Sequence, residues 1–289
     1  MKKFLALAGL LALLLVGCAP SVPPADIVAT TLPVYEFTTR LCDGTGLTVS
    51  RLVTENVSCL HDYSLNVDQV RATEAAELII LSGAGLEDFM DGMLSGKNIV
   101  DASAGLELLE NCHGHHEEHA DHHHEHDAHI WLSPENARMM AANICAGLVE
   151  QYPAHRAMFE TNLAGLLTDI DALQTYAQTQ LQDLSCRQII TFHDGFAYMA
   201  DAFDLTILQA IEEESGSEAS AAELKQIISS VQEHGLTAVF VEKSGSVSAA
   251  GIISAETGAT VYTLDMAMSG DSWFEAMYRN IDTLREALQ

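Results

Sequence analysis

The sequence predicts an α/β protein of two Rossmann-like lobes, each a mainly parallel sheet flanked by helices, joined by one long rigid helix. Short apolar runs alternate with longer amphipathic stretches in both halves, which is typical of parallel strands linked by crossover helices. Between the halves, residues 153–184 carry apolar side chains at helical spacing and no strand signal. We therefore expect a first lobe at 26–150, a connecting long helix at 151–185 and a second lobe at 186–289.

The expected elements can be placed within each lobe. In the first lobe we expect strands at 27–30, 48–53, 78–81 and 99–100, with helices beginning at Val34, Asn66 and Gly85. Ser133 and Pro134 then mark a helix start, with proline at the first helical position. In the second lobe we expect strands at 188–191, 205–208, 238–241 and 260–264, with helices beginning at Phe196, Ser220, Val247 and Ser272. Ligands of such sheets bind beyond the carboxyl ends of the strands and between lobes.

The N-terminus has the order of an export signal, with Lys2 and Lys3 before an apolar run and Gly17 before Cys18. The run is shorter than the roughly 20 residues of a membrane-spanning helix. Its Leu-Val-Gly-Cys ending resembles a bacterial lipoprotein signal, which implies a signal peptide at 1–17, lipidation of Cys18 and a tether at 18–25. This resemblance implies an exported protein, anchored by lipid to the outer face of the cell membrane or periplasmic. An ordinary cleaved signal is the alternative.

The charge of the chain favours cationic partners. It has 41 acidic residues against 13 Lys and Arg, for a net charge of −28. Nucleic-acid binding depends on basic side chains that neutralise phosphates, so the composition argues against it. An exported location also permits disulfides. Cys42 and Cys59 are the preferred pair, because they flank one predicted strand of the first lobe.

Three histidines are expected at loop positions, two in the first lobe and one in the second. They are His61 in CLHDYSL, His129 in DAHIWLSP and His193 in TFHDGF. A metal-bound imidazole needs a hydrogen-bond partner on its other nitrogen, and the adjacent Asp62 and Asp194 are candidates for that role. One such histidine would more often be structural, but three in these positions favour a shared metal ion.

A histidine tract interrupts the first lobe at residues 112–127, with the sequence CHGHHEEHADHHHEHD. It has no apolar periodicity, so we expect a mobile surface loop that contributes nothing to the core. Its histidines could form a weak auxiliary metal-collecting loop, and a solvated acidic loop with incidental affinity is the alternative. They are His113, His115, His116, His119, His122, His123, His124 and His126.

Nearly the whole chain after the signal resembles the bacterial ABC-transporter solute-binding proteins for zinc and manganese. The resemblance rests on ATTLPVYEF, HDYSL, the HIWLSP junction, TFHDGFAYMADAF and the terminal LDMAMSGDSWFEAMYRNIDTL. It implies a metal held by His61, His129, His193 and a late carboxylate, Asp265. Leu60 departs from the family's frequent proline, which bears on loop geometry. The resemblance further implies an ABC-type metal permease as partner, and we expect a monomer.

Three imidazoles and one carboxylate suit tetrahedral Zn²⁺. Mn²⁺, which prefers more oxygen ligands, is the less favoured cargo. A zinc-dependent hydrolase is an alternative from another class, since an open metal position with Asp62 or Asp194 as base would suit it. Some members of the family are also called adhesins, but nothing in this chain encodes a host ligand.

Overall fold

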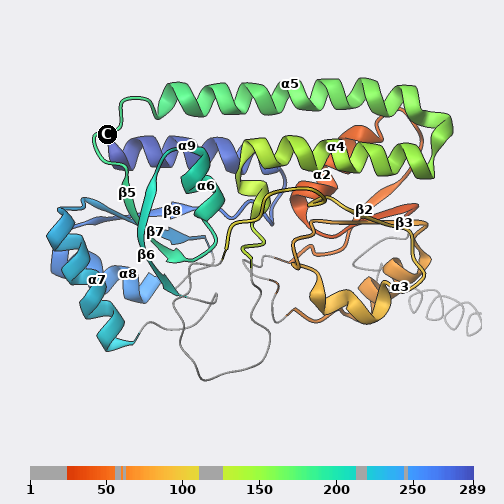
Figure 1. The fold of residues 1–289 in the computed structure, drawn as a ribbon. Coiled ribbons are helices and arrows are strands. Elements are labelled where there is room, and N and C mark those ends of the chain that lie inside the picture. Colours follow the sequence, from red (N-terminus) through yellow and green to blue (C-terminus); the bar gives the residue numbers. More distant parts are fainter. Residues whose placement is uncertain (1–24, 56–59, 61–62, 111–125, 213–219, 244–246) are drawn as a thin grey trace, which may run out of the picture.

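A computed structural model describes residues 25–55, 60, 63–110, 126–212, 220–243 and 247–289. The chain forms two lobes, each built around a four-stranded parallel sheet (Figure 1). The predicted signal peptide, Cys18 and the tether lie outside the described residues, apart from Ala25. Among the helices in the described ranges, none is long and apolar enough to cross a membrane.

The first lobe contains a sheet of order β2-β1-β3-β4 in which every neighbouring pair is parallel. Its strands are β1 (Ile27–Ala29), β2 (Val49–Arg51), β3 (Leu78–Leu81) and β4 (Ile99–Asp101), and its helices include α2 (Leu32–Leu41) and α3 (Val67–Ala75). Asn66 caps α3 through a capping box with Gln69. The four strands predicted in this lobe are confirmed, with bounds that differ by no more than a few residues.

The prediction of an α-helix beginning at Gly85 is wrong. The chain instead has a short 3₁₀ helix at Asp88–Met93. Gly83, Ala84 and Gly85 all have positive φ angles of 86°, 54° and 83°. This left-handed backbone makes a tight turn after β3, and a right-handed helix cannot begin within it.

The second lobe repeats the topology of the first, with strand order β6-β5-β7-β8 and only parallel pairs. Its strands are β5 (Gln188–His193), β6 (Thr206–Glu212), β7 (Ala238–Glu242) and β8 (Thr260–Leu264). Its helices are α6 (Ala197–Ala202), α7 (Ala221–His234), α8 (Val247–Thr257) and α9 (Trp273–Leu288). In both sheets the strand that comes first in the chain, β1 or β5, is internal and has the second strand on one side and the third on the other.

One long helix joins the lobes and runs antiparallel to the helix that precedes it (Figure 1). Helix α4 (Pro134–Gln151) is followed by a 3₁₀ turn at Pro153–His155 and then by α5 (Arg156–Gln180). The 25 residues of α5 span about 37 Å at 1.5 Å per residue. Helix α5 runs over both lobes and packs on α2 and α4 of the first and on α9 of the second (Figure 1). The predicted connecting helix is therefore present, slightly shorter than expected.

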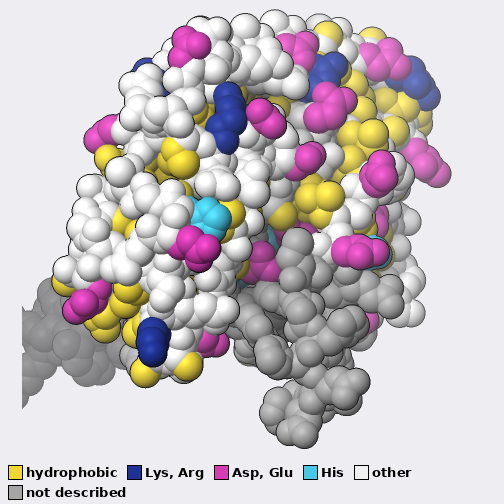
Figure 2. Space-filling model, turned by 60° about the vertical axis from the view of Figure 1, so that its left-hand side comes forward, with side chains coloured by type: hydrophobic (Ala, Val, Ile, Leu, Met, Phe, Trp, Pro, Cys, Tyr) yellow, Lys and Arg dark blue, Asp and Glu magenta, His cyan; other side chains and the backbone are white. Residues whose placement is uncertain are grey.

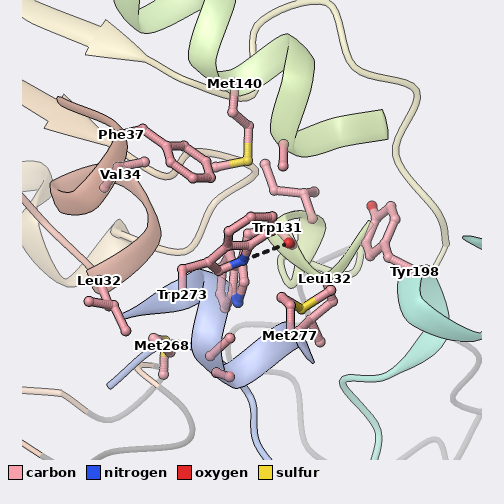
Figure 3. Packing of buried hydrophobic residues seen from close by; sticks show 14 of the residues in the cluster. Leu32, Val34, Phe37, Trp131, Leu132, Met140, Tyr198, Met268, Trp273 and Met277 are labelled. Atoms are coloured by element: carbon pink, nitrogen blue, oxygen red, sulfur yellow. Dashed lines mark hydrogen bonds between the residues drawn. The ribbon is translucent and has the colours of Figure 1, made fainter. Parts of the chain in front are cut away.

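The hydrophobic core is continuous across the junction of the lobes (Figure 3). Trp131 follows His129 in the chain, and its indole N–H donates to the carbonyl of Met266 in the second lobe at 2.7 Å. Trp273 at the start of α9 donates in turn to the carbonyl of Trp131 at 3.1 Å. The Trp273 ring also packs edge-on against Phe37 of α2, with centroids 5.1 Å apart. These contacts resist a large hinge motion between the lobes.

The predicted disulfide between Cys42 and Cys59 stays a prediction. Cys42 follows α2 and lies in the core as a free thiol, 4% exposed. Burial raises the pKa of the Cys42 thiol to about 12, so the thiol stays protonated. Cys59 lies outside the described residues. In the structure Cys42 packs as a small residue of the first lobe's core.

Candidate metal centre

His193 is the last residue of β5 and lies at the carboxyl end of the second sheet. The strand before it is internal, paired with β6 on one side and β7 on the other, and its residues 189–192 are buried. His193 itself is only 2% exposed. The sheet therefore fixes the backbone of this histidine and presents its imidazole at the strand end, where ligands of such folds bind.

His129 lies at the junction of the lobes, in the turn that precedes α4. A short 3₁₀ helix at Ile130–Leu132 follows it, and then Ser133 caps α4 by accepting from the backbone N–H of Asn136. The hydrogen bonds of Trp131 and Trp273 hold this turn against the second lobe. His129 is 4% exposed, so its imidazole is fixed inside the molecule.

The two imidazoles face each other. The Nε2 atoms of His129 and His193 lie 3.4 Å apart, and the ring planes are nearly perpendicular at 84°. Two ligand nitrogens about 2.0 to 2.1 Å from a tetrahedral ion are separated by about 3.3 to 3.4 Å. The structure therefore brings together two histidines that are 64 residues apart in the chain, at the separation that tetrahedral coordination requires.

Asp127 orients His129. Its Oδ1 accepts from the backbone N–H of His129 at 2.8 Å and lies 2.7 Å from Nδ1 of the same residue. This contact places the ring proton on Nδ1, so the lone pair of Nε2 is directed at the candidate metal position. Asp127 is 4% exposed, which excludes water from the pair. Asp127 is not among the orienting residues predicted from the sequence, although it stands two positions before His129.

The predicted orienting roles of Asp62 and Asp194 stay predictions. Asp62 lies outside the described residues, and so does His61, the third predicted ligand. Asp194 is partly buried directly after His193.

Asp265, the predicted fourth ligand, lies just beyond β8 and is 9% exposed. Its Oδ1 accepts from the backbone N–H of Ala267 at 2.9 Å. Its Oδ2 lies 3.4 Å from the Arg279 guanidinium and 3.6 Å from the Lys243 ammonium. Within the described part of the chain, no three His, Cys, Asp or Glu side chains form a group able to hold a metal ion. Ligation by Asp265 stays a prediction.

Glu242 is a further buried carboxyl group at this edge of the sheet. It is the last residue of β7, which is paired with β5, and it is 2% exposed. Since Thr191 pairs with Phe240, His193 and Glu242 occupy equivalent positions at the ends of neighbouring strands. Sequence reasoning missed Glu242 because the residue simply ends an apolar run.

The base of the histidine tract lies beside the centre. Residues 111–125 are outside the described ranges, but Glu110 and His126 pair as an isolated antiparallel bridge. The Tyr198 hydroxyl of α6 accepts from the backbone N–H of Leu109 and donates to the carbonyl of Asp127, both at 2.9 Å. Tyr198 of the second lobe thus contacts Leu109, which precedes the tract, and Asp127, the last residue of the tract, which also contacts His129.

The family model for the periplasmic component A of zinc-uptake complexes matches residues 27–287. The chain belongs to this family. It is 27% identical over 279 residues to the high-affinity zinc uptake system protein ZnuA of Bacillus subtilis, covering 91% of this chain and 87% of the relative. A crystal structure of ZnuA superposes with a TM-score of 0.80 at 31% identity, over 92% of this chain and all of the other.

A zinc-bound ZnuA deletion mutant has a TM-score of 0.76 at 30% identity, over 92% of this chain and 98% of that one. These comparisons confirm the predicted fold and the predicted family. The zinc-uptake family consists of solute-binding proteins that work with ABC transporters. Because these proteins are not enzymes, membership excludes the hydrolase alternative.

Proposed function

We propose that this protein captures Zn²⁺ outside the cytoplasm and delivers it to an ABC-type metal permease. The ion is held between the lobes by His61, His129 and His193. The observation that carries this proposal is the 3.4 Å separation of the His129 and His193 Nε2 atoms, with Asp127 fixing the tautomer of the first ring. The zinc-uptake relatives and the zinc-bound neighbour support the choice of metal.

Zn²⁺ suits this ligand set better than Mn²⁺. Imidazole nitrogen is a favoured ligand for zinc, whereas manganese prefers carboxylate and carbonyl oxygens. Manganese capture remains the second candidate, because buried carboxyl groups at Glu242 and Asp265 lie at the same edge of the sheet.

The acidic surface supports capture of a cation. Acidic side chains are spread widely over the face drawn in Figure 2 and do not form a single patch. Together with the net charge of −28, they produce a negative potential that attracts divalent ions from solution. The histidine tract would add a weak collecting site, and its last residue, Asp127, contacts His129.

The lobes are expected to close only slightly around the ion. The continuous core and α5 oppose a hinge motion, so binding would shift local loops more than whole lobes. We further propose that Cys18 is lipidated, that the protein is tethered to the outer face of the membrane as a monomer, and that the permease receives the metal there.

Zinc affinity of site variants tests this proposal. Competition titration with a chromophoric chelator should show a loss of at least about 100-fold for His129→Ala or His193→Ala, because removing one of a few ligands leaves an incomplete shell. Deleting residues 113–125 should cost much less. The deletion must stop there, since His126 pairs with Glu110 and Asp127 contacts His129.

His234→Ala is the matched control. This histidine is exposed at the end of α7 and belongs neither to the candidate metal centre nor to the histidine tract. It should leave zinc affinity unchanged. If the tract deletion abolished tight binding while the His129 and His193 variants retained it, the principal site would lie in the tract. Parallel titrations with Mn²⁺ decide between the two metals.

A further inference from the structure

The carboxylate of Asp265 forms a hydrogen bond and two ion pairs with groups of its own lobe. Its Oδ1 accepts from the backbone N–H of Ala267, and its Oδ2 lies within 3.6 Å of two cations, Arg279 and Lys243. The Asp265 side chain is 12% exposed, whereas those of Arg279 and Lys243 are 58% and 53% exposed. A mostly buried anion is thus neutralised by two cations that reach it from the surface.

The backbone around Asp265 is fixed as well. Asn280 of α9, itself 1% exposed, accepts from the Asp265 backbone N–H at 2.8 Å and donates to its carbonyl at 2.7 Å. The next carbonyl, of Met266, accepts from the Trp131 indole. Because the main chain is held on both sides, only rotation of the side chain can move the carboxylate.

This segment adjoins the candidate metal centre. A Cβ atom built on Gly195 would lie 2.6 Å from Cε of Met266 and 2.9 Å from Nε2 of His193, so both atoms face the same small space. Asp265 directly precedes Met266. Asp265 is thus the chain neighbour of a residue whose side chain borders the His193 imidazole, and its carboxylate pairs with Arg279 and Lys243.

We propose that Lys243 and Arg279 form a cation clamp that competes with the metal for the Asp265 carboxylate and thereby sets metal specificity. The inference rests on the proposed function of the same site. While the clamp holds Asp265, the centre is dominated by imidazoles, which favours Zn²⁺. When it releases Asp265, the centre gains a charged oxygen ligand, which favours Mn²⁺ more than Zn²⁺.

The test is removal of the clamp in the full chain, as the double variant Lys243→Met and Arg279→Met. We expect its Mn²⁺ affinity to rise about 10-fold, the scale of two partly exposed ion pairs. The rise in Zn²⁺ affinity should be smaller. Asp265→Asn should then reduce Mn²⁺ affinity by about 10-fold in the double variant and by less in the wild-type background. The absorption of bound Co²⁺ gives an independent readout of the added oxygen ligand.

A control pair, Arg71→Met and Lys225→Met, removes two exposed cations elsewhere and keeps the net charge matched. If the clamp variant and the control pair changed Mn²⁺ affinity equally, or if Asp265→Asn cost the same in both backgrounds, the clamp would be refuted. Such a result is distinct from failure of the proposed function, which would appear as unchanged zinc affinity in His129→Ala and His193→Ala.

Discussion

Oδ1 of Asp127 lies 2.7 Å from Nδ1 of His129, and both side chains are almost completely buried. The same oxygen accepts the backbone N–H of His129, so the aspartate fixes the main chain and the ring together. Asp127 is also the residue at which the histidine tract ends. One carboxylate therefore links the tract to the candidate metal centre.

Replacing Asp127 with Asn should weaken zinc binding by about 10- to 100-fold, the usual effect of losing the partner of a metal-bound histidine. The amide retains an oxygen but not the charge that makes the imidazole a stronger ligand. Competition titration measures the loss, and Asp91→Asn, at an exposed position of the first lobe, is the control. Equal affinities for the two variants would show that Asp127 has only a structural role.

Zinc affinity should fall steeply as the pH is lowered below about 6.5, the ordinary pKa of histidine. Only neutral imidazole binds the ion, so protons and Zn²⁺ compete for the same nitrogens. Titrations at pH 7.5 and 5.5 check the slope, and a flat profile would contradict coordination by histidines.

Much of the fold was predictable from the sequence, because apolar runs bounded by turn residues mark buried parallel strands. All eight expected strands are present. The prediction of a helix from Gly85 was wrong because residues 83–85 form a turn with left-handed backbone angles. The spacing of apolar residues carries no information about such a turn. The disulfide prediction stays a prediction, because Cys59 lies outside the described residues and only the buried Cys42 is placed.

The site was predictable in part. His193 was expected in a loop position after a strand at 188–191 and is in fact the last residue of β5, while its approach to His129 was expected. Asp127, Glu242 and the cations around Asp265 were missed, since their importance depends on contacts between residues distant in the chain or on the local direction of a carboxylate. The sequence indicated candidate ligands by residue type. Only the structure identified the groups that hydrogen-bond to these ligands or form ion pairs with them.

Trp273→Phe should destabilise the whole protein by about 1 to 3 kcal/mol. The substitution removes the donor to the buried carbonyl of Trp131 and leaves space beside Phe37. Because the core is continuous across the junction, we expect one cooperative transition in denaturant, shifted to a lower midpoint. Phe274→Leu, at the neighbouring partly exposed position, is a control that should cost less. Two separate transitions in the Trp273 variant would show that the lobes fold independently.

The stability of the protein should depend on the ionisation of Glu87, a buried residue of the first lobe. Burial raises the pKa of its carboxyl group to about 7, despite hydrogen bonds donated by the Thr30 hydroxyl and by the backbone N–H groups of Ser82 and Gly83. In the unfolded chain the group has its ordinary pKa of 4.5. The folded protein therefore binds the proton more tightly, and its stability falls as the pH rises from about 4.5 to about 7.

The loss across this range should be on the order of 3 kcal/mol, since each pKa unit corresponds to about 1.4 kcal/mol. Glu87→Gln removes the titration and should flatten this part of the profile, although its amide cannot accept from both Ser82 and Gly83. Denaturant unfolding at several pH values, compared between Glu87→Gln and the wild type, measures the difference. If both proteins changed in parallel between pH 4.5 and 7, another group would be responsible for the dependence.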